Sequence, residues 1–464
     1  MQLTFHGAAQ MVTGSCFVLE TPAGTVMVDR GMYQGGRRVE RANWDKPGFD
    51  PTQVRWLLLT HAHIDHSGLI PLLRRQGFQG EILATRGTVD LCRIMLPDSG
   101  HVQEEDAAFA AKQLRKRGRP GPAPEPLYTV DDARQCLQDF RSVAYDETLD
   151  LGSGLSCRFV DAGHILGSAI VEVWVGGSRQ TKIVFSGDLG QPGRPIVRDP
   201  TLIEEADVLV MESTYGDRLH EDTEQRTGRL LEIIAPTLLH GGHVIVPSFA
   251  VERTQELLYT LNELIEAGRL PPAPTYLDSP LAIEATEVFR QHPECYDDDT
   301  QRLLASGDDP FDFQGLIPTR TVDESKAINA VEGPAIIISA SGMCTAGRIR
   351  HHLRNHIGHP EDTVLFVGYQ AQGTLGRLLV DGRKEITLFG ERRRVRAQIE
   401  SLDGFSAHAD QAGLLDWLGA FRRRPKQVCL VHGEPQAAAV LAGLIQSRFG
   451  VGVRVPEMGE TVEL

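Results

Sequence analysis

His61-Ala62-His63-Ile64-Asp65-His66 gathers three histidines and one aspartate into six consecutive positions. The motif follows an apolar run, residues 55–59, that has the composition of a buried β-strand ending near Thr60. It precedes a segment that we expect to be helical from Ser67, with Pro71 tolerated because it falls in the first turn. The polar residues therefore occupy a tight strand-to-helix turn, a unit typical of α/β folds.

The same turn has the composition of a metal site. Imidazole and carboxylate are ligands that Zn²⁺ prefers, at about 2.0–2.2 Å. A turn can direct such side chains toward two neighbouring ions, as one helical face could not. The alternative is an accidental His-rich turn without a metal. We favour a metal site because unpaired polar groups so close to an apolar strand need partners.

Further ligands have to come from other parts of the chain, because one zinc ion needs at least three protein ligands and two ions need more. Three candidates have a similar setting: His164, Asp188 and His432. Each is flanked by glycine, which lets the backbone approach a crowded centre. A lone His or Asp beside glycine is otherwise most often a turn or capping residue, so these candidates depend on the first motif.

Short apolar runs, each ending in a polar residue, alternate along the chain with stretches of helical periodicity, and this alternation predicts an α/β architecture. Ligands of such sheets collect outside the carboxyl ends of the strands. The clearest predicted strands are 25–28, 55–59, 182–185, 208–211, 243–246, 335–338, 364–367 and 427–431. The residues that end them are Asp29, His61, Asp188, Glu212, Ser248, Ser341, Tyr369 and His432. The predicted helices are 103–114, 131–140, 253–267 and 414–421, with an exposed loop at 117–126.

The composition, 464 residues with 41% hydrophobic and 23% charged, suits a soluble protein of two domains. No apolar run approaches the roughly 20 residues of a membrane span, and the N-terminus lacks a secretion signal, so we expect a cytoplasmic protein.

Seven cysteines without Cys-x-x-Cys spacing indicate buried thiols. The net charge of −15 argues against an extended basic surface, but the basic clusters 115–119, 392–396 and 422–426 could still contact phosphates locally.

Two ordered sets of these residues resemble a known signature. Asp29, the His61–His66 motif, His164 and Asp188 resemble the metallo-β-lactamase superfamily. The later set resembles its β-CASP branch, which processes nucleic acids, and consists of Glu212, His408 and His432. The likeness covers essentially the whole chain and is greatest to prokaryotic RNA-metabolising enzymes related to the cleavage-and-polyadenylation endonuclease subunit. It implies an αββα sandwich that carries an inserted α/β β-CASP domain.

The resemblance implies two zinc ions per chain. One would be held by His61, His63 and His164, and the other by Asp65, His66 and His432, with Asp188 between them. Asp29 would orient the ligand turn. Most ligands precede residue 190 but His432 lies near the end, so the chain must leave the metal domain and return. We expect the metal domain in residues 1–205 and 384–464, and the β-CASP domain in residues 206–383.

Two zinc ions can lower the pKa of a bridging water and neutralise charge on a phosphorane, which suits phosphodiester hydrolysis. The resemblance gives Asp65 a catalytic part besides its place as a ligand. His408 is the candidate general acid, with Glu212 fixing its tautomer. The alternative for His408 is a helix N-terminal capping site in which the ring is incidental.

Glycine-bearing segments of the predicted insert could grip phosphates through backbone N–H groups. The candidates are Ser248, Ser341, Gly342, Arg348 and His352, and a similar segment spans 369–377. Each could instead belong to a helix N-cap. The family pattern usually has glycine where this chain has Glu252, which leaves the part played by Arg253 open.

His432 favours RNA, because family members that act on DNA generally resemble one another in lacking this histidine. We expect single-stranded RNA held by its backbone, since only 6% of the residues are aromatic. Two rivals stay open: a thioester or lactone hydrolase, which would not need Glu212 and His408, and an inactive scaffold, which would lack ligands. The sequence also leaves open endonuclease against 5′-exonuclease, base preference, cleavage of DNA, the physiological RNA and a homodimer.

Overall fold

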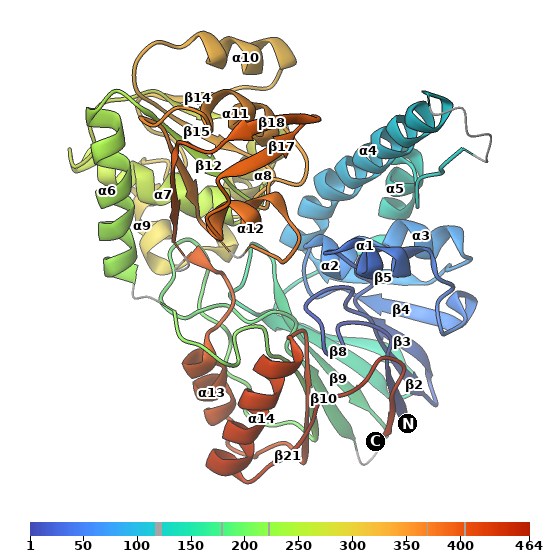
Figure 1. Ribbon diagram of the computed structural model, residues 1–464. Helices are drawn as coiled ribbons and strands as arrows, with labels where there is room; N and C mark the ends of the chain where they lie inside the picture. The colour runs from blue at the N-terminus through green and yellow to red at the C-terminus, as the bar shows by residue number, and fades with distance from the viewer. Residues whose placement is uncertain (117–122, 178–179, 221–222, 369, 403–404) are drawn as a thin grey trace. The chain divides into compact units, whose positions relative to one another are not determined.

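The computed structural model describes residues 1–116, 123–177, 180–220, 223–368, 370–402 and 405–464. The chain forms two compact units. Unit 1 consists of Met1–Pro192, Asp199–Leu219 and His408–Leu464, and unit 2 of Gly193–Arg198 and His220–Ala407. Both termini belong to unit 1 and lie side by side (Figure 1), where the N–H of Leu464 donates to the carbonyl of Met1.

Unit 1 contains two seven-stranded sheets. In spatial order the first consists of β22 (Thr461–Glu463), β1 (Gln2–Phe5), β2 (Phe17–Thr21), β3 (Gly24–Val28), β4 (Val54–Leu58), β5 (Glu81–Thr85) and β6 (Phe140–Val143). The second consists of β21 (Gly452–Arg454), β20 (Gln427–Val431), β11 (Val208–Glu212), β10 (Thr181–Phe185), β9 (Ala169–Val175), β8 (Leu155–Asp161) and β7 (Thr148–Gly152). One core joins their facing sides, with Phe17 of the first sheet stacked on Phe185 of the second.

Helices cover the outer sides of both sheets, so unit 1 is an αββα sandwich (Figure 1). Beside the first sheet lie α1 (Arg37–Glu40), α2 (Ile64–Ser67), α3 (Ile70–Arg75), α4 (Arg86–Lys116) and α5 (Val130–Cys136). Beside the second lie α13 (Gln411–Gly419) and α14 (Pro435–Phe449), whose Leu414 and Leu441 pack in one core with Leu209 and Met211 of β11.

Unit 2 is built on a six-stranded sheet whose neighbouring strands are parallel. Its order is β14 (Leu316–Pro318), β13 (Thr275–Leu277), β15 (Ala335–Ser339), β12 (His243–Pro247), β16 (Thr363–Phe366) and β19 (Gln398–Ser401). Along β12, Val244 and Val246 join one core while Ile245 joins another, as expected of a strand buried on both faces.

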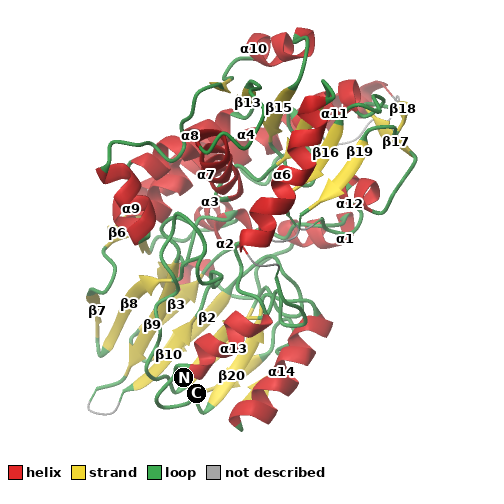
Figure 2. Cartoon of the chain, turned by 90° about the vertical axis from the view of Figure 1, so that its left-hand side faces the viewer, coloured by secondary structure: helices red, strands yellow, loops and turns green. Residues whose placement is uncertain are grey.

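Helices of unit 2 supply the other side of each core (Figure 2). The core that contains Val244 includes residues of α6 (Thr223–Leu239), α7 (Arg253–Glu266) and α8 (Pro280–Arg290). The core that contains Ile245 includes residues of α11 (Ile349–His356) and α12 (Leu375–Val380). The unit also contains α9 (Asp298–Ala305) and α10 (Val322–Ala327). A separate hairpin joins β17 (Glu385–Leu388) to β18 (Glu391–Arg394).

The eight predicted strands are confirmed, each within one residue, as β3, β4, β10, β11, β12, β15, β16 and β20. The helix predicted at 131–140 ends early, at Cys136, because Phe140 begins β6 and pairs with Ile82. The one predicted at 103–114 is part of the longer α4. Of the loop predicted at 117–126, residues 117–122 lie outside the described residues.

The unit boundaries differ from the predicted domain boundaries at residues 206 and 383. β11 belongs to unit 1 because it pairs between β10 and β20. Residues 384–407 belong to unit 2, where β19 pairs with β16.

The cysteine prediction is confirmed, since all seven thiols are free and buried. None of the helices in the described part of the chain is both long enough and apolar enough to cross a bilayer.

Candidate metal centre

The His61–His66 motif lies at the carboxyl end of β4, in unit 1. The helix that follows begins at Ile64, earlier than the predicted Ser67, with His63 as its N-cap. It ends at Ser67, and α3 starts separately at Ile70. Pro71 explains the interruption, because it has no N–H to donate to the turn before it and is tolerated only at the start of a helix.

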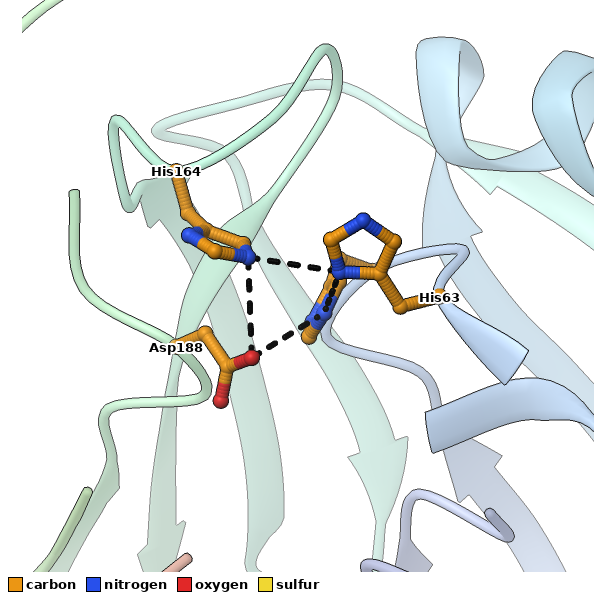
Figure 3. Close-up of side chains that lie close together, drawn as sticks. His63, His164 and Asp188 are labelled. Carbon is orange, nitrogen blue, oxygen red and sulfur yellow. Dashed lines mark hydrogen bonds and ion pairs between the residues drawn. The ribbon is translucent and has the colours of Figure 1, made fainter. Parts of the chain in front are cut away.

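Ligand-type atoms of His61, His63, His164 and Asp188 form a first cluster, and Figure 3 labels the last three of them. The Nε2 atom of His61 lies 3.1 Å from Nδ1 of His63 and 3.4 Å from Oδ2 of Asp188. The Nε2 atom of His164 lies 3.3 Å from the same Nδ1 and 3.5 Å from the same Oδ2. Four ligands at about 2.0–2.1 Å from a tetrahedral zinc ion are about 3.3–3.4 Å apart. The separations therefore fit one ion.

A second cluster lies on the other side of Asp188 and contains Asp65, His66 and His432. The Nε2 atom of His66 is 3.3 Å from Oδ1 of Asp188, and Nε2 of His432 is 3.4 Å from Oδ2 of Asp65. The carboxylate of Asp188 thus presents one oxygen to each cluster. Its Oδ1 is buried with no hydrogen-bond donor among the described residues, so a cation would satisfy it.

The protonation states suit metal binding. Burial lowers the pKa of His63 to about 4, and burial with the surrounding imidazoles holds the pKa values of His61 and His164 well below that of a free histidine. Burial opposes ionisation of Asp188, but His432 and His66 outweigh it and hold its pKa well below the ordinary value. Neutral imidazoles and ionised carboxylates are the forms in which these residues bind zinc.

Asp29, at the end of β3, supports the ligand turn. Its Oδ1 accepts the backbone N–H of Thr60 at 2.8 Å, and its Oδ2 accepts the Thr60 hydroxyl at 2.9 Å and Nδ1 of His66 at 2.7 Å. Burial lowers the pKa of His66, but Asp188 and Asp29 raise it well above the ordinary value. Nε2 therefore carries a proton when no metal is bound, and a metal ion at Nε2 would displace that proton while Asp29 keeps the one on Nδ1.

His408 and Glu212 form a pair next to the first cluster. The Nδ1 atom of His408 lies 3.1 Å from both carboxylate oxygens of Glu212, and its Nε2 lies 3.8 Å from Oδ2 of Asp188. Although burial lowers the pKa of His408, Glu212 and Asp188 raise it to about 9. The capping alternative for His408 is wrong, because the residue that caps α13 is Asp410, which accepts the N–H of Gly413.

Glycines beside the candidate ligands make the expected close approaches. A Cβ at Gly190 would lie 1.6 Å from the carbonyl oxygen of Gly163, next to His164. A Cβ at Gly31 would lie 1.6 Å from the carbonyl oxygen of Asp65. Side chains at either position would push the ligand loops apart.

The sequence reasoning missed several supporting hydroxyl groups. Thr60 donates to Asp29, Thr214 Oγ1 lies 3.1 Å from Nδ1 of His432, and Ser186 Oγ accepts the backbone N–H of Glu212 at 3.0 Å. Each lies within two positions of a predicted site residue, at the end of a strand, and that position is the signal that could have found them.

The candidate phosphate loops lie in unit 2, at the carboxyl ends of β12 and β15. Two of them meet, since a Cβ at Gly342 would lie 2.8 Å from the ring of Phe249, which follows Ser248. The hydroxyl of Ser248 accepts from Thr254. Ser341 accepts the N–H of Thr345 at 3.1 Å. Tyr369, of the similar segment 369–377, lies outside the described residues.

Arg348 and His352 both bind the buried carboxylate of Asp278, each at 2.7 Å. Arg348 also donates to the backbone carbonyls of Thr319 and Arg320. A phosphate would have to displace these bonds to reach either side chain. Separately, Glu252 has φ 65°, a left-handed conformation that explains why the family pattern usually has glycine there.

Three family models match the chain: the metallo-β-lactamase superfamily at residues 10–232, the Beta-Casp domain at 254–379, and the Zn-dependent metallo-hydrolase RNA specificity domain at 392–456. Ribonuclease TTHA0252 from Thermus thermophilus is 38% identical over 463 residues, which cover 98% of this chain and 100% of that protein. Transcription termination factor FttA from Pyrococcus abyssi is 32% identical over 483 residues, which cover 100% of this chain and 71% of that protein.

A solved structure also matches, that of a protein of unknown function from Enterococcus faecalis. The TM-score is 0.55 and the identity 13%, with 100% of this chain and 99% of the other covered. At this identity the likeness concerns the fold.

Proposed function

The chain belongs to the β-CASP branch of the metallo-β-lactamase superfamily, and from that membership we propose that it is a zinc-dependent ribonuclease. Its substrate is single-stranded RNA in the cytoplasm, and its cofactor is two zinc ions per chain. The observation that carries the proposal is the carboxylate of Asp188, which presents Oδ2 to one ligand cluster and Oδ1 to the other. The names of the relatives, a ribonuclease and a transcription termination factor, support RNA as the substrate.

Zinc ions bound by the two clusters would supply an activated water and neutralise charge on the phosphoryl group. The chain's own residues position the protons. Glu212 accepts a hydrogen bond from Nδ1–H of His408, so the Nε2 of a protonated His408 can give its proton to the leaving oxygen. With its pKa raised to about 9, His408 is protonated at neutral pH. Asp29 holds a proton on Nδ1 of His66, so a metal ion would bind this ring at Nε2 in place of the Nε2 proton.

The geometry argues against the two rivals. A thioester or lactone hydrolase has no need of His408 paired with a buried Glu212 next to the metal ligands. A scaffold without activity would lack ligands, whereas all seven predicted ligands lie in the two clusters.

The test uses end-labelled RNA that bears either a 5′-phosphate or a 5′-hydroxyl. We expect cleavage by the zinc-loaded protein. His408→Ala should retain its zinc and lose about 10²–10⁴-fold of the rate. His359→Ala is the matched control, because His359 lies in unit 2 and is exposed. Full activity of His408→Ala would refute the general acid, and no cleavage by the wild type would reopen thioester hydrolysis.

The same gel separates the two modes of cleavage. Internal fragments from both RNAs would mean an endonuclease. Stepwise release of mononucleotides from the 5′-phosphorylated RNA alone would mean a 5′-exonuclease.

A further inference from the structure

Unit 2 contains a separate cluster of metal-type ligands. His243 is the first residue of β12, Asp362 immediately precedes β16, and His356 is the last residue of α11. Ligand atoms of the three residues lie within 4.8 Å of one another, the same proximity that defines the clusters around Asp188. Oδ2 of Asp362 is 2.8 Å from Nδ1 of His356, and its Oδ1 is 3.5 Å from Nδ1 of His243.

The two imidazoles are not satisfied by this arrangement alone. Their side chains are only 14% and 11% exposed, and the ring centroids are 4.8 Å apart. The Nε2 atoms of His243 and His356 are buried and have no hydrogen-bond partner among the residues that the structure describes. The Nδ1 atoms, on the other side of each ring, face the Asp362 carboxylate, so these are the atoms that would bind a divalent cation together with it.

The carboxylate carries the charge that a cation requires. Oδ1 of Asp362 also accepts the backbone N–H of His243 at 2.8 Å. That bond fixes the carboxylate between the two strands, so a metal here would find its oxygen ligand already positioned.

A pocket of about 620 Å³ lies near the cluster and is lined by residues next to Asp362 in the chain and by hydrogen-bond partners of that region. Its lining includes Glu232, Glu361 and Glu400. Glu361 is the chain neighbour of Asp362, and Gln398, which also lines the pocket, donates its N–H to the Asp362 carbonyl at 2.9 Å. Arg229 also lines the pocket, but the three carboxylates outnumber it, so the pocket would attract cations to the neighbourhood of the cluster.

We propose that His243, His356 and Asp362 form a metal site of unit 2 that binds a divalent cation of the zinc type and ties α11 to β12 and β16. Two imidazoles and one carboxylate are a ligand set that suits Zn²⁺, with water completing the coordination. The site lies at the amino ends of β12 and β16, whereas Ser248 and Ser341 follow the carboxyl ends of β12 and β15. Its metal is therefore structural and takes no part in the reaction proposed above.

The test is equilibrium dialysis of the full chain against zinc, with bound metal measured by plasma mass spectrometry. We expect His356→Gln to bind one equivalent less than the wild type, and Asp362→Asn to bind the same zinc at least about tenfold more weakly. Asn keeps an acceptor for the N–H of His243, so this second variant should fold. His359→Gln is the control, because His359 lies in the same loop and outside the cluster.

Two further measurements make the outcomes decisive. RNA cleavage by both variants should stay within about twofold of the wild type, and a variant of the other centre, His61→Ala, should keep the unit 2 equivalent. The proposal is overturned if His356→Gln binds as much zinc as the wild type. It is also overturned if the variants lose zinc and cleavage together.

Discussion

Replacing Asp29 with asparagine should weaken zinc binding without disturbing the fold. The amide oxygen can still accept the N–H of Thr60, but the amide nitrogen must then occupy the position of Oδ2, which accepts Nδ1 of His66 at 2.7 Å. An amide N–H donated to Nδ1 moves the imidazole proton to Nε2, the atom that faces Asp188. The ring is then in the wrong tautomer for a metal.

Loss of such a supporting carboxylate typically costs 10–100-fold in metal affinity, which corresponds to about 1.4–2.7 kcal/mol. The backbone should tolerate the change, because Asp29 has φ 60° and asparagine adopts this region more readily than most residues. The assay is competition for zinc with a chromophoric chelator. Asp50→Asn serves as the control, since Asp50 is exposed and caps a short helix through Thr52. A Kd for Asp29→Asn within about twofold of the wild type would refute the tautomer argument.

Three other results are expected. Glu212→Gln removes the charge that raises the pKa of His408 to about 9. The cleavage rate should therefore begin to fall at a lower pH on the alkaline side of the pH–rate profile. An unchanged alkaline side would contradict the pairing of Glu212 with His408. Gly190→Ala places a Cβ 1.6 Å from the carbonyl oxygen of Gly163. The variant should therefore lose roughly 2 kcal/mol or more of unfolding free energy, melt at a lower temperature and bind less zinc. A thermal melt like that of the wild type would contradict the close approach. Because the pKa of His63 is lowered to about 4, this ligand stays neutral at pH 6, where an ordinary histidine is mostly protonated. The zinc of the first cluster should therefore survive dialysis at pH 6, and loss of both equivalents at that pH would count against the assignment.

The strands that the sequence predicted are buried apolar runs with polar residues at one end, so each can be recognised from its own residues alone. The antiparallel strands were harder to see. In β8 buried and partly buried positions alternate, and in β9 the fully buried Glu172 interrupts the apolar pattern. Its charge is balanced by Lys182 and Arg158, each with a nitrogen 2.6 Å from the carboxylate. No local pattern indicates that two distant cations will meet one carboxylate.

Some residues of the candidate site could likewise be recognised from local sequence, and others only from the fold. His61, His63, Asp65 and His66 are neighbours in sequence, so spacing alone suggested a metal. His408 lies 196 positions from Glu212, and its placement depends on a bridge between its backbone and that of Gly190. Only the assembled fold shows that Asp410, rather than His408, is the cap of α13.

The pairing of β20 with β11 has a consequence for how the protein is made. All ligands of the first cluster have left the ribosome when Asp188 has been synthesised and released from the exit tunnel. The second cluster is complete only after His432 has followed, and the N–H of His432 then donates to the carbonyl of Ala8. At about 5–20 residues per second, the roughly 240 intervening residues take about 12–50 s to synthesise. A nascent chain therefore carries half a metal centre during that interval and should be unable to cut the messenger that encodes it.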